Sequence, residues 1–265
     1  MEQDVQPWRI VQLTDSHLFA DEHRCLQGMN TRESFAAVVD LVRSEQPEID
    51  LVLGTGDIAQ DSSHEAYRLF QQSALSLCDE MRWIPGNHDE ADVMAALPFG
   101  GPHNLKIVDR ENWRIILLDS SVSKKVHGFL EPAEMQFLQE ALATAGDRHV
   151  LITLHHHPIP SGCDWLDNHN LKNTDEFQQL VKAFPQVRGI LWGHIHQSLD
   201  TLRDGVRYLA TPSTCIQFAP DQVDFKLDSA PPGYRWLELH ANGHIESAVS
   251  RVNVALEVDL AGTGY

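Results

Sequence analysis

Residues 189–196 have the sequence GILWGHIH, in which a short apolar run passes directly into a pair of histidines. A short apolar run bounded by glycines is typical of a buried strand, so we predict a strand that ends where the polar residues begin. Four other segments of the chain follow the same plan. The five predicted strands are residues 10–13, 50–53, 82–84, 150–154 and 189–192.

Each of these strands is followed by a cluster that contains Asp, Asn or His. The carboxyl ends of neighbouring strands in an α/β sheet meet at one crevice, so we expect side chains that are distant in sequence to lie together at one edge of the sheet. Carboxylates, imidazoles and an amide are ligands typical of a transition-metal site. The clusters are TDSH (14–17), GTGD (54–57), PGNHD (85–89), HHHP (155–158) and GHIH (193–196).

The spacing within the clusters supports this interpretation. Asp15 and His17 are two residues apart, as are His194 and His196, and on extended backbone such residues point to the same side. Glycine permits tight turns and a close approach of the backbone to bound groups. The glycines of these clusters are at positions 54, 56, 86 and 193.

The formal charge of such a site favours an anionic substrate. Two divalent ions would be opposed by Asp15, Asp57 and a bridging hydroxide, which leaves roughly one positive charge for a phosphate. Asn87 contributes a neutral amide where a carboxylate would have removed that surplus.

The composition sets limits on the class of protein. The chain has 265 residues, of which 42% are hydrophobic and 22% charged, as in an ordinary globular protein. A formal net charge of −18 argues against nonspecific binding to nucleic acid or to an anionic membrane. The start, MEQDVQPWRI, lacks the pattern of a secretory signal peptide, so we expect a cytoplasmic protein in which the four scattered cysteines are free thiols.

Amphipathic helical segments alternate with the apolar runs, which predicts an α/β fold. A sixth strand is predicted over residues 114–118. Capping residues predict helices that begin after Asn30, with Glu33 three residues later, and after Ser62, with Glu65 three residues later. Further helices are predicted to begin near Pro132, which is favoured at a first helical position, and near Asn173 as a capping residue, with Glu176 three residues later.

The pattern changes to hairpins after about residue 198. Asp204-Gly205 and Asn242-Gly243 each separate two apolar runs, and both dipeptides favour two-residue hairpins with primed turns. No linker or repeat divides the chain. We therefore expect one domain over residues 1–250, followed by a tail or arm over residues 251–265.

Taken in order, Asp15-x-His17, Gly56-Asp57, Gly86-Asn87-His88-Asp89, the His155 cluster and Gly193-His194-x-His196 resemble the motif set of the calcineurin-like metallophosphoesterases. The longer stretches 14–19, 155–167 and 210–218 are similar to the bacterial class III 3′,5′-cyclic AMP phosphodiesterases. The resemblance implies a four-layer α/β/β/α sandwich with a dinuclear metal site at the carboxyl ends of the strands.

The resemblance also implies the metal ligands. Asp15, His17 and His196 would bind one ion, Asn87, His155 and His194 the other, and Asp57 would bridge the two. The ions would be divalent transition metals, and Fe, Mn, Zn and Co are all compatible with such ligands.

One ligand in the row of three histidines needs a choice. We choose His155 because it directly follows the apolar strand, as the family's ligand does. His157 is the alternative, since alternation along a strand would put it on the same side as His155.

The activity implied is hydrolysis of 3′,5′-cyclic AMP to 5′-AMP by a metal-bridging hydroxide, which lowers intracellular cyclic AMP. His88 would contact the phosphate and help the leaving oxygen depart, with Asp57 as the second catalytic residue. The substrate-binding residues implied by the resemblance are His17, Asp57, Asn87, His88 and His196.

Other interpretations stay open. The same site would serve a different small phosphodiester or phosphomonoester, and a non-catalytic scaffold that binds proteins is disfavoured because all seven ligand positions are filled. We expect a small nucleotide (cyclic AMP or AMP) as the partner, without nucleic acid or membrane, and a homodimer through a hairpin or the C-terminal arm stays open.

His169 and Asn170 are candidates for the border of the pocket. Thr211, Ser213 and Thr214 would either hold a turn or present groups to a nucleotide.

Overall fold

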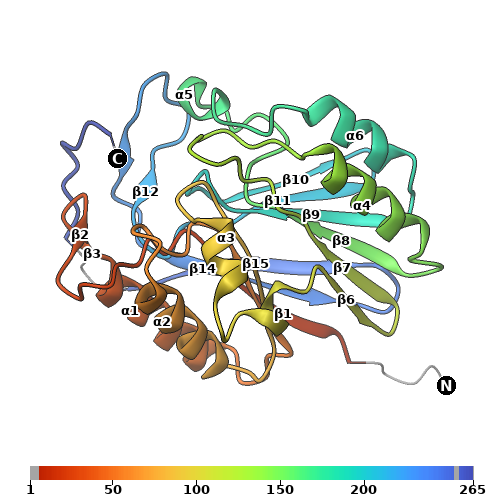
Figure 1. The fold of residues 1–265 in the computed structure, drawn as a ribbon, viewed down its shortest axis with the longest axis horizontal. Coiled ribbons are helices and arrows are strands. Elements are labelled where there is room, and N and C mark those ends of the chain that lie inside the picture. Colours follow the sequence, from red (N-terminus) through yellow and green to blue (C-terminus); the bar gives the residue numbers. More distant parts are fainter. Residues whose placement is uncertain (1–5, 254–256, 265) are drawn as a thin grey trace.

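The computed structural model describes residues 6–253 and 257–264, and its centre consists of two β-sheets packed face to face (Figure 1). The five-stranded sheet has the order β15-β14-β1-β4-β5 and the six-stranded sheet the order β10-β11-β9-β8-β7-β6. The strands of the first sheet are β1 (Trp8–Leu13), β4 (Leu51–Thr55), β5 (Met81–Ile84), β14 (Gly233–Leu239) and β15 (Ile245–Arg251). Those of the second are β6 (Ile107–Arg110), β7 (Trp113–Leu117), β8 (His149–Thr153), β9 (Val187–Trp192), β10 (Leu199–Arg203) and β11 (Val206–Ala210).

Helices cover the outer face of each sheet, which gives the four layers α/β/β/α (Figure 1). Helices α1 (Thr31–Glu45) and α2 (His64–Leu75) pack on the five-stranded sheet, and α4 (Pro132–Ala143) and α6 (Thr174–Lys182) pack on the six-stranded sheet. The predicted fold class is confirmed. The smaller elements are β2 (Cys25–Leu26), β3 (Met29–Asn30), α3 (Ala91–Ala96), a 3₁₀ turn (Gly101–Asn104), α5 (Asp164–Asp167), β12 (Gln217–Phe218) and β13 (Leu227–Asp228).

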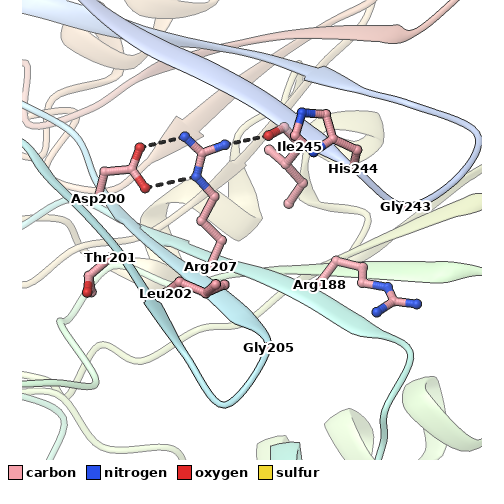
Figure 2. Close-up of a pocket in the computed structure, with 9 residues that line it drawn as sticks. All are labelled: Arg188, Asp200, Thr201, Leu202, Gly205, Arg207, Gly243, His244 and Ile245. Atoms are coloured by element: carbon pink, nitrogen blue, oxygen red, sulfur yellow. Dashed lines mark hydrogen bonds and ion pairs between the residues drawn. The ribbon is translucent and has the colours of Figure 1, made fainter.

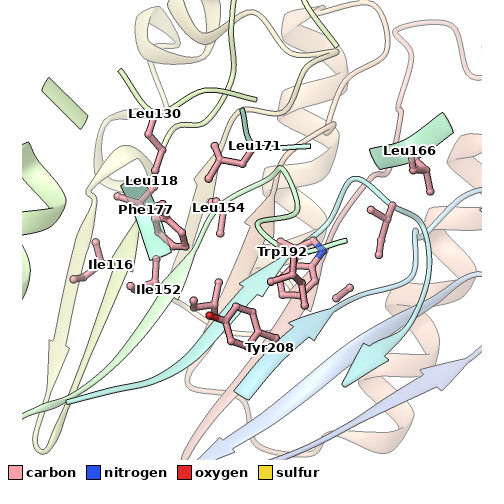
Figure 3. Packing of buried hydrophobic residues seen from close by; sticks show 14 of the residues in the cluster. Ile116, Leu118, Leu130, Ile152, Leu154, Leu166, Leu171, Phe177, Trp192 and Tyr208 are labelled. Atoms are coloured by element: carbon pink, nitrogen blue, oxygen red, sulfur yellow. The ribbon is translucent and has the colours of Figure 1, made fainter. Parts of the chain in front are cut away.

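Alternate residues of the strands supply separate apolar layers. In β1, Ile10 belongs to the layer between the two sheets, whereas Val11 and Leu13 belong to the layer under the helices. This alternation follows from the two-residue period of a strand. Figure 3 shows the layer between the six-stranded sheet and its helices, where Ile152 and Phe177 lie among the buried side chains.

The strands that precede the polar clusters run parallel. β1 pairs with β4 and β4 with β5, while β8 pairs with β9 in the second sheet, all in parallel register. Their carboxyl ends therefore lie at one end of each sheet, as the sequence predicted. No described helix combines the length and the apolar character that a bilayer crossing requires.

Three local predictions were wrong in detail. The cap of α2 is Ser63, whose side chain accepts the N–H of Ala66, because Ser62 has a left-handed backbone (φ 50°) and lies outside the helix. Helix α6 does begin after Asn173, but the Asn173 side chain bonds both the N–H and the carbonyl of Leu130 instead of capping the helix.

The third correction concerns the β14–β15 hairpin. His240 and His244 pair through their backbones, so the connection has three residues, and Gly243 has a positive φ of 86°. Such a loop ends in a bulge that needs glycine, in place of the predicted two-residue turn. The Asp204-Gly205 hairpin between β10 and β11 has the predicted form, with both residues at positive φ.

The described part of the C-terminal segment, residues 257–264, lies against the β2–β3 hairpin. The N–H of Asp259 donates to the carbonyl of Gln27 over 2.7 Å, and the Gln27 side chain bonds the carbonyl of Gly264. Val258 packs against the core of the second sheet.

The layer between the sheets predicts a contrast between two leucines. Leu191 of β9 is completely buried in this layer, so Leu191→Ala should lower the free energy of unfolding by about 2–5 kcal/mol, because it removes buried methyl groups and leaves a cavity. Leu202 of β10 is 71% exposed, so Leu202→Ala should change the free energy of unfolding by less than about 0.5 kcal/mol. Urea unfolding measures both, and equal losses in the two variants would contradict this account of the core.

Candidate metal and active site

The structure brings the five polar clusters together between the carboxyl ends of the two sheets. Asp15 and His17 follow β1, Asp57 follows β4, and Asn87 and His88 follow β5. The second sheet contributes the residues that follow β8 and β9, which are His155, His194 and His196. The site thus lies where the two sheets meet, and neither sheet contains all of its residues.

The backbone at the site is left-handed, not extended. Asp15 and His17 have φ values of 53° and 45°, and Asp57 has 49°. His194 and His196 have 66° and 48°. The predicted extended backbone was therefore wrong. Asp15 and His17 still belong to one group of donor atoms, whereas His194 and His196 belong to different groups. Non-glycine residues in this conformation are uncommon, each costs about 1–3 kcal/mol, and they concentrate at functional sites.

Two glycines allow the clusters to approach one another. A Cβ atom on Gly86 would lie closer than 3.0 Å to both Oδ1 and the backbone nitrogen of Asp57. A Cβ atom on Gly193 would meet the carboxylate of Asp15 and the hydroxyl of Thr14 at a similarly close distance. Any larger residue at these positions would displace a carboxylate of the site.

One group of donor atoms consists of Asp15, His17 and His196. Their donor atoms lie within 4.8 Å of one another, and all three side chains are fully buried. Nε2 of His196 is 3.3 Å from Nε2 of His17 and 3.3 Å from Oδ1 of Asp15. This arrangement can hold a metal ion.

A second group surrounds Asp57. Nε2 of His155 lies 3.3 Å from Oδ2 of Asp57, 3.3 Å from Oδ1 of Asn87 and 4.0 Å from Oδ1 of Asp15. Asp57 also lies 3.9 Å from Nε2 of His17, so it stands between the two groups.

Four buried side-chain atoms of the polar clusters lack a hydrogen-bond partner among the described residues. They are Oδ2 of Asp57, both ring nitrogens of His194 and Nδ1 of His157. Oδ2 of Asp57 contacts Nε2 of His155 over 3.3 Å, but without the geometry of a hydrogen bond. Buried polar atoms are almost always paired, so unpaired ones need an explanation. A bound divalent cation supplies one, because carboxylate oxygens and imidazole nitrogens are its usual ligands. The residues present therefore fit a divalent-metal site.

Hydrogen bonds fix the orientation of three imidazoles. Nδ1 of His155 bonds the carbonyl of Thr55, and Nδ1 of His196 bonds the carbonyl of Ile216, both over 2.8 Å. Nδ1 of His17 bonds the side-chain oxygen of Gln60 over 2.6 Å. In the neutral form of each ring, the contact holds the proton on Nδ1 and directs the lone pair of Nε2 into the site.

The other two histidines of the row have different surroundings. His156 is engaged at both ring nitrogens, by the hydroxyl of Ser120 and the carbonyl of Val126. Nε2 of His157 bonds Asp167 over 3.2 Å. The chain leaves the strand after Thr153, so alternation does not govern where these rings point. All three rings pack around His194, with centroid distances between 4.7 and 5.6 Å.

Burial controls the protonation of most of the imidazoles. It lowers the pKa of His17 to about 3 and holds the pKa of His194 well below the usual value, so both rings are neutral and able to bind a cation. Burial opposes the charged form of His155 as well, but the adjacent carboxylate of Asp57 outweighs it and raises the pKa of His155 to about 9. Burial would raise the pKa of Asp57, yet the imidazoles of His155 and His88 hold it well below the usual value.

His88 lies at the edge of the donor groups, beside a cavity of about 240 Å³. Its backbone N–H donates to Oδ1 of Asp57 over 2.8 Å, and its ring centroid is 5.1 Å from that of His17. His169 lines the same cavity, whereas Asn170 is not among the residues that line it.

Asp89 is a structural residue of the site to which the sequence analysis gave no role. Its carboxylate accepts the backbone N–H groups of Ile58, Ala59 and Gly86 over 2.9–3.1 Å, so it joins the loops that carry Asp57 and Asn87. Burial and the charge of Asp57 raise the pKa of Asp89 to about 6. Its place in the PGNHD cluster was a signal, whereas nothing in the sequence marked Gln60.

The segment over residues 210–218 forms hydrogen bonds with the loop that carries Asp15. The hydroxyl of Ser213 donates to the carbonyl of Asp15 over 2.7 Å, and the backbone N–H of Thr214 donates to the carbonyl of Thr14. Thr211, Ser213 and Thr214 are completely buried, so they hold the loop and do not face a nucleotide.

A cavity of about 520 Å³, larger than the one beside His88, lies elsewhere (Figure 2). Its lining includes Arg188, at the opposite end of β9 from His194, and Arg207. Both terminal groups of the Arg207 guanidinium are already engaged, by Asp200 and by the carbonyl of Ile245. No residue of the polar clusters lines this cavity, so its size does not make it the active site.

Comparison with known proteins identifies relatives over nearly the whole chain. A family model described as calcineurin-like phosphoesterase matches residues 9–198. The 3′,5′-cyclic adenosine monophosphate phosphodiesterase CpdA of Pseudomonas aeruginosa is 47% identical over 257 residues, which cover 97% of this chain and 94% of the relative. The CpdA of Escherichia coli K12 is 46% identical with the same coverage.

A solved structure shares the fold at much lower identity. A dimetal phosphatase from Danio rerio superimposes with a TM-score of 0.65 and 14% identity, covering 94% of this chain and all of the other. At this identity the similarity concerns the fold alone.

The close approach of Gly86 to Asp57 generates a prediction. Gly86→Ala should displace Asp57 and lower the affinity for divalent metal by about 10- to 100-fold, the usual effect of disturbing a residue that positions a ligand. Gly101→Ala is the matched control, because a Cβ atom there meets nothing within 4 Å. Elemental analysis after equilibration at fixed free Mn²⁺, with circular dichroism to verify folding, measures the effect. Unchanged metal content in folded Gly86→Ala would show that this contact does not position Asp57.

Proposed function

The chain belongs to the calcineurin-like phosphoesterase family, and from this membership we propose that it hydrolyses 3′,5′-cyclic AMP to 5′-AMP with divalent metal ions and so lowers intracellular cyclic AMP. The observation that carries the proposal is a cluster of donor groups, six of them buried and Asn87 partly buried, in a chain that matches cyclic AMP phosphodiesterases over 97% of its length. We also propose a cytoplasmic location, supported by four cysteines that are all free thiols.

We assign the metal ligands as two groups. Asp15, His17 and His196 would hold one ion, and Asn87, His155 and His194 would hold the other. Asp57 would contact both ions. The short distances within each group and the unpaired atoms of Asp57 and His194 support this assignment.

The choice of His155 over its neighbours rests on its ring geometry. Its Nδ1 is held by Thr55 and its Nε2 faces Asp57 and Asn87, whereas both ring nitrogens of His156 are engaged and Nε2 of His157 bonds Asp167. His156 lies close enough to His155 and His194 for their donor atoms to form a group, but its bonds to Ser120 and Val126 oppose a ligand role.

When bound, divalent ions would lower the pKa of a water molecule and offset the charge of the phosphodiester. The side chains of the protein would bind the substrate and transfer a proton to the leaving oxygen. In the reaction, the oxygen of water bonds to phosphorus and the water gives up one proton to solvent, the bond from phosphorus to O3′ breaks, and O3′ gains one proton. His88 lines the cavity beside the donor groups and is placed to supply that proton.

The remaining substrate contacts follow from position. We propose that His17, Asp57, Asn87 and His196 contact the phosphate side of the substrate together with His88, since these residues surround one space. Hydrolysis of another small phosphodiester or phosphomonoester is the alternative that the same donor set would serve.

The activity itself is tested with metal-loaded and chelator-treated protein. We expect the loaded enzyme to convert cyclic AMP to 5′-AMP, as followed by chromatography, and the chelated enzyme to lose this activity until Mn²⁺ or Fe²⁺ is restored. Bis(p-nitrophenyl) phosphate serves as a second substrate. Cleavage of that diester without any production of 5′-AMP would reject the proposed substrate and favour another phosphoester.

The role of His88 is tested by substitution. His88→Ala should lower kcat for cyclic AMP by about 10²- to 10⁴-fold, the range for loss of a general acid, while the metal content stays the same. His64→Ala is the control, because His64 is an exposed residue at the start of α2, outside the site. Metal loss in parallel with activity would assign His88 a structural role instead.

A further inference from the structure

The cavity beside the donor groups has two kinds of wall. Its lining includes His88 and His194 from the polar clusters and the aromatic residues Trp165, Phe218 and Phe225. None of the described residues that line it is Lys, Arg, Asp or Glu. The cavity therefore offers apolar aromatic surface directly beside the place where the phosphate is expected.

The three aromatic rings form one cluster. The Trp165 ring centroid lies 5.0 Å from that of Phe218 and 5.1 Å from that of Phe225, with edge-to-face angles of 77° and 71°. Phe218 and Phe225 are 5.6 Å apart. Edge-to-face contacts of this kind keep the rings in fixed orientations.

Phe218 also joins this cluster to the donor groups. Its ring stacks on that of His196, with centroids 4.1 Å apart and an angle of 8° between the planes. A ligand in the cavity would therefore contact rings whose positions are fixed relative to the phosphate site.

We propose that this aromatic cavity holds the adenine ring of the nucleotide, an inference that rests on the proposed function. A volume of about 240 Å³ is below the roughly 300–1,000 Å³ of pockets for whole drug-sized ligands, so it suits one part of the nucleotide. The absence of cationic side chains from its described lining makes it unsuitable for a second phosphate. A flat, uncharged purine matches such walls, because bases stack on aromatic side chains.

Phe225 is the residue at which this inference is tested. It is partly buried and follows β12, and it belongs to none of the proposed metal or phosphate contacts. Phe225→Ala removes the ring, and Phe225→Leu keeps apolar volume without an aromatic face. Phe225→Tyr keeps the ring. The matched control is Phe137→Ala. Phe137 is a partly buried aromatic residue of α4, and it is not among the residues that line the aromatic cavity.

The first measurement compares two substrates with the metal-loaded enzymes. We expect Phe225→Ala and Phe225→Leu to raise KM for cyclic AMP by about 10-fold or more, the usual effect of losing a base-stacking ring. The same variants should leave kcat/KM for a phosphodiester without any aromatic ring, such as glycerophosphoethanolamine, within about 2-fold, because stacking on Phe225 requires a ring in the ligand. Phe225→Tyr and Phe137→Ala should match the wild type on both substrates.

The second measurement is binding. Isothermal calorimetry should show that Phe225→Leu weakens 5′-AMP but leaves inorganic phosphate unchanged. Equal losses on both substrates, or wild-type KM for cyclic AMP in a folded Phe225→Ala enzyme, would overturn the inference while the proposed function stands. A wild-type enzyme that cleaves only bis(p-nitrophenyl) phosphate would overturn both.

Discussion

The site depends on one contact between the two sheets. The carboxylate of Asp15, after β1, accepts the backbone N–H of His194, after β9, over 3.0 and 3.1 Å. The backbone N–H of Asp15 in turn donates to the carbonyl of Gly56, after β4. A buried carboxylate must be satisfied by donors, so this residue fixes three strand ends relative to one another. If the sheets moved apart, the facing nitrogens of His17 and His196 would separate.

The same burial that isolates the site from water prepares it for a cation. Asp15 and Asp57 are completely buried, and isolated buried charges are strongly unfavourable. Neighbouring imidazoles offset the free-energy cost of these buried charges only in part, because burial lowers the pKa of His17 and His194 and keeps both rings neutral. Left-handed backbone at five of the donor residues adds strain, and the three apolar layers of the fold supply the stability that maintains it.

The sequence predicted the parts of this molecule that depend on local pattern. Apolar runs located the five strands, and the polar clusters after them contain the residues of the two donor groups, because parallel strands place their carboxyl ends together. Gln60, which bonds His17, was not marked by any local pattern. Features that depend on three-dimensional contacts were not predictable. The left-handed conformation of Asp15 and the engagement of Asn173 by Leu130 both depend on neighbours that no local pattern specifies.

The site must attract an anion although the protein carries a formal charge of −18. Surface charges act weakly beyond a Debye length of about 8 Å at physiological ionic strength, whereas groups inside a buried site are screened much less. The local donors therefore determine which ligand binds. Divalent ions held by the donor groups would supply attraction for phosphate, and the ring cluster of Trp165, Phe218 and Phe225 supplies an uncharged surface beside it. A nucleotide combines an anionic ester with a flat neutral ring, and this pairing of surfaces favours it over a phosphoester that lacks the ring.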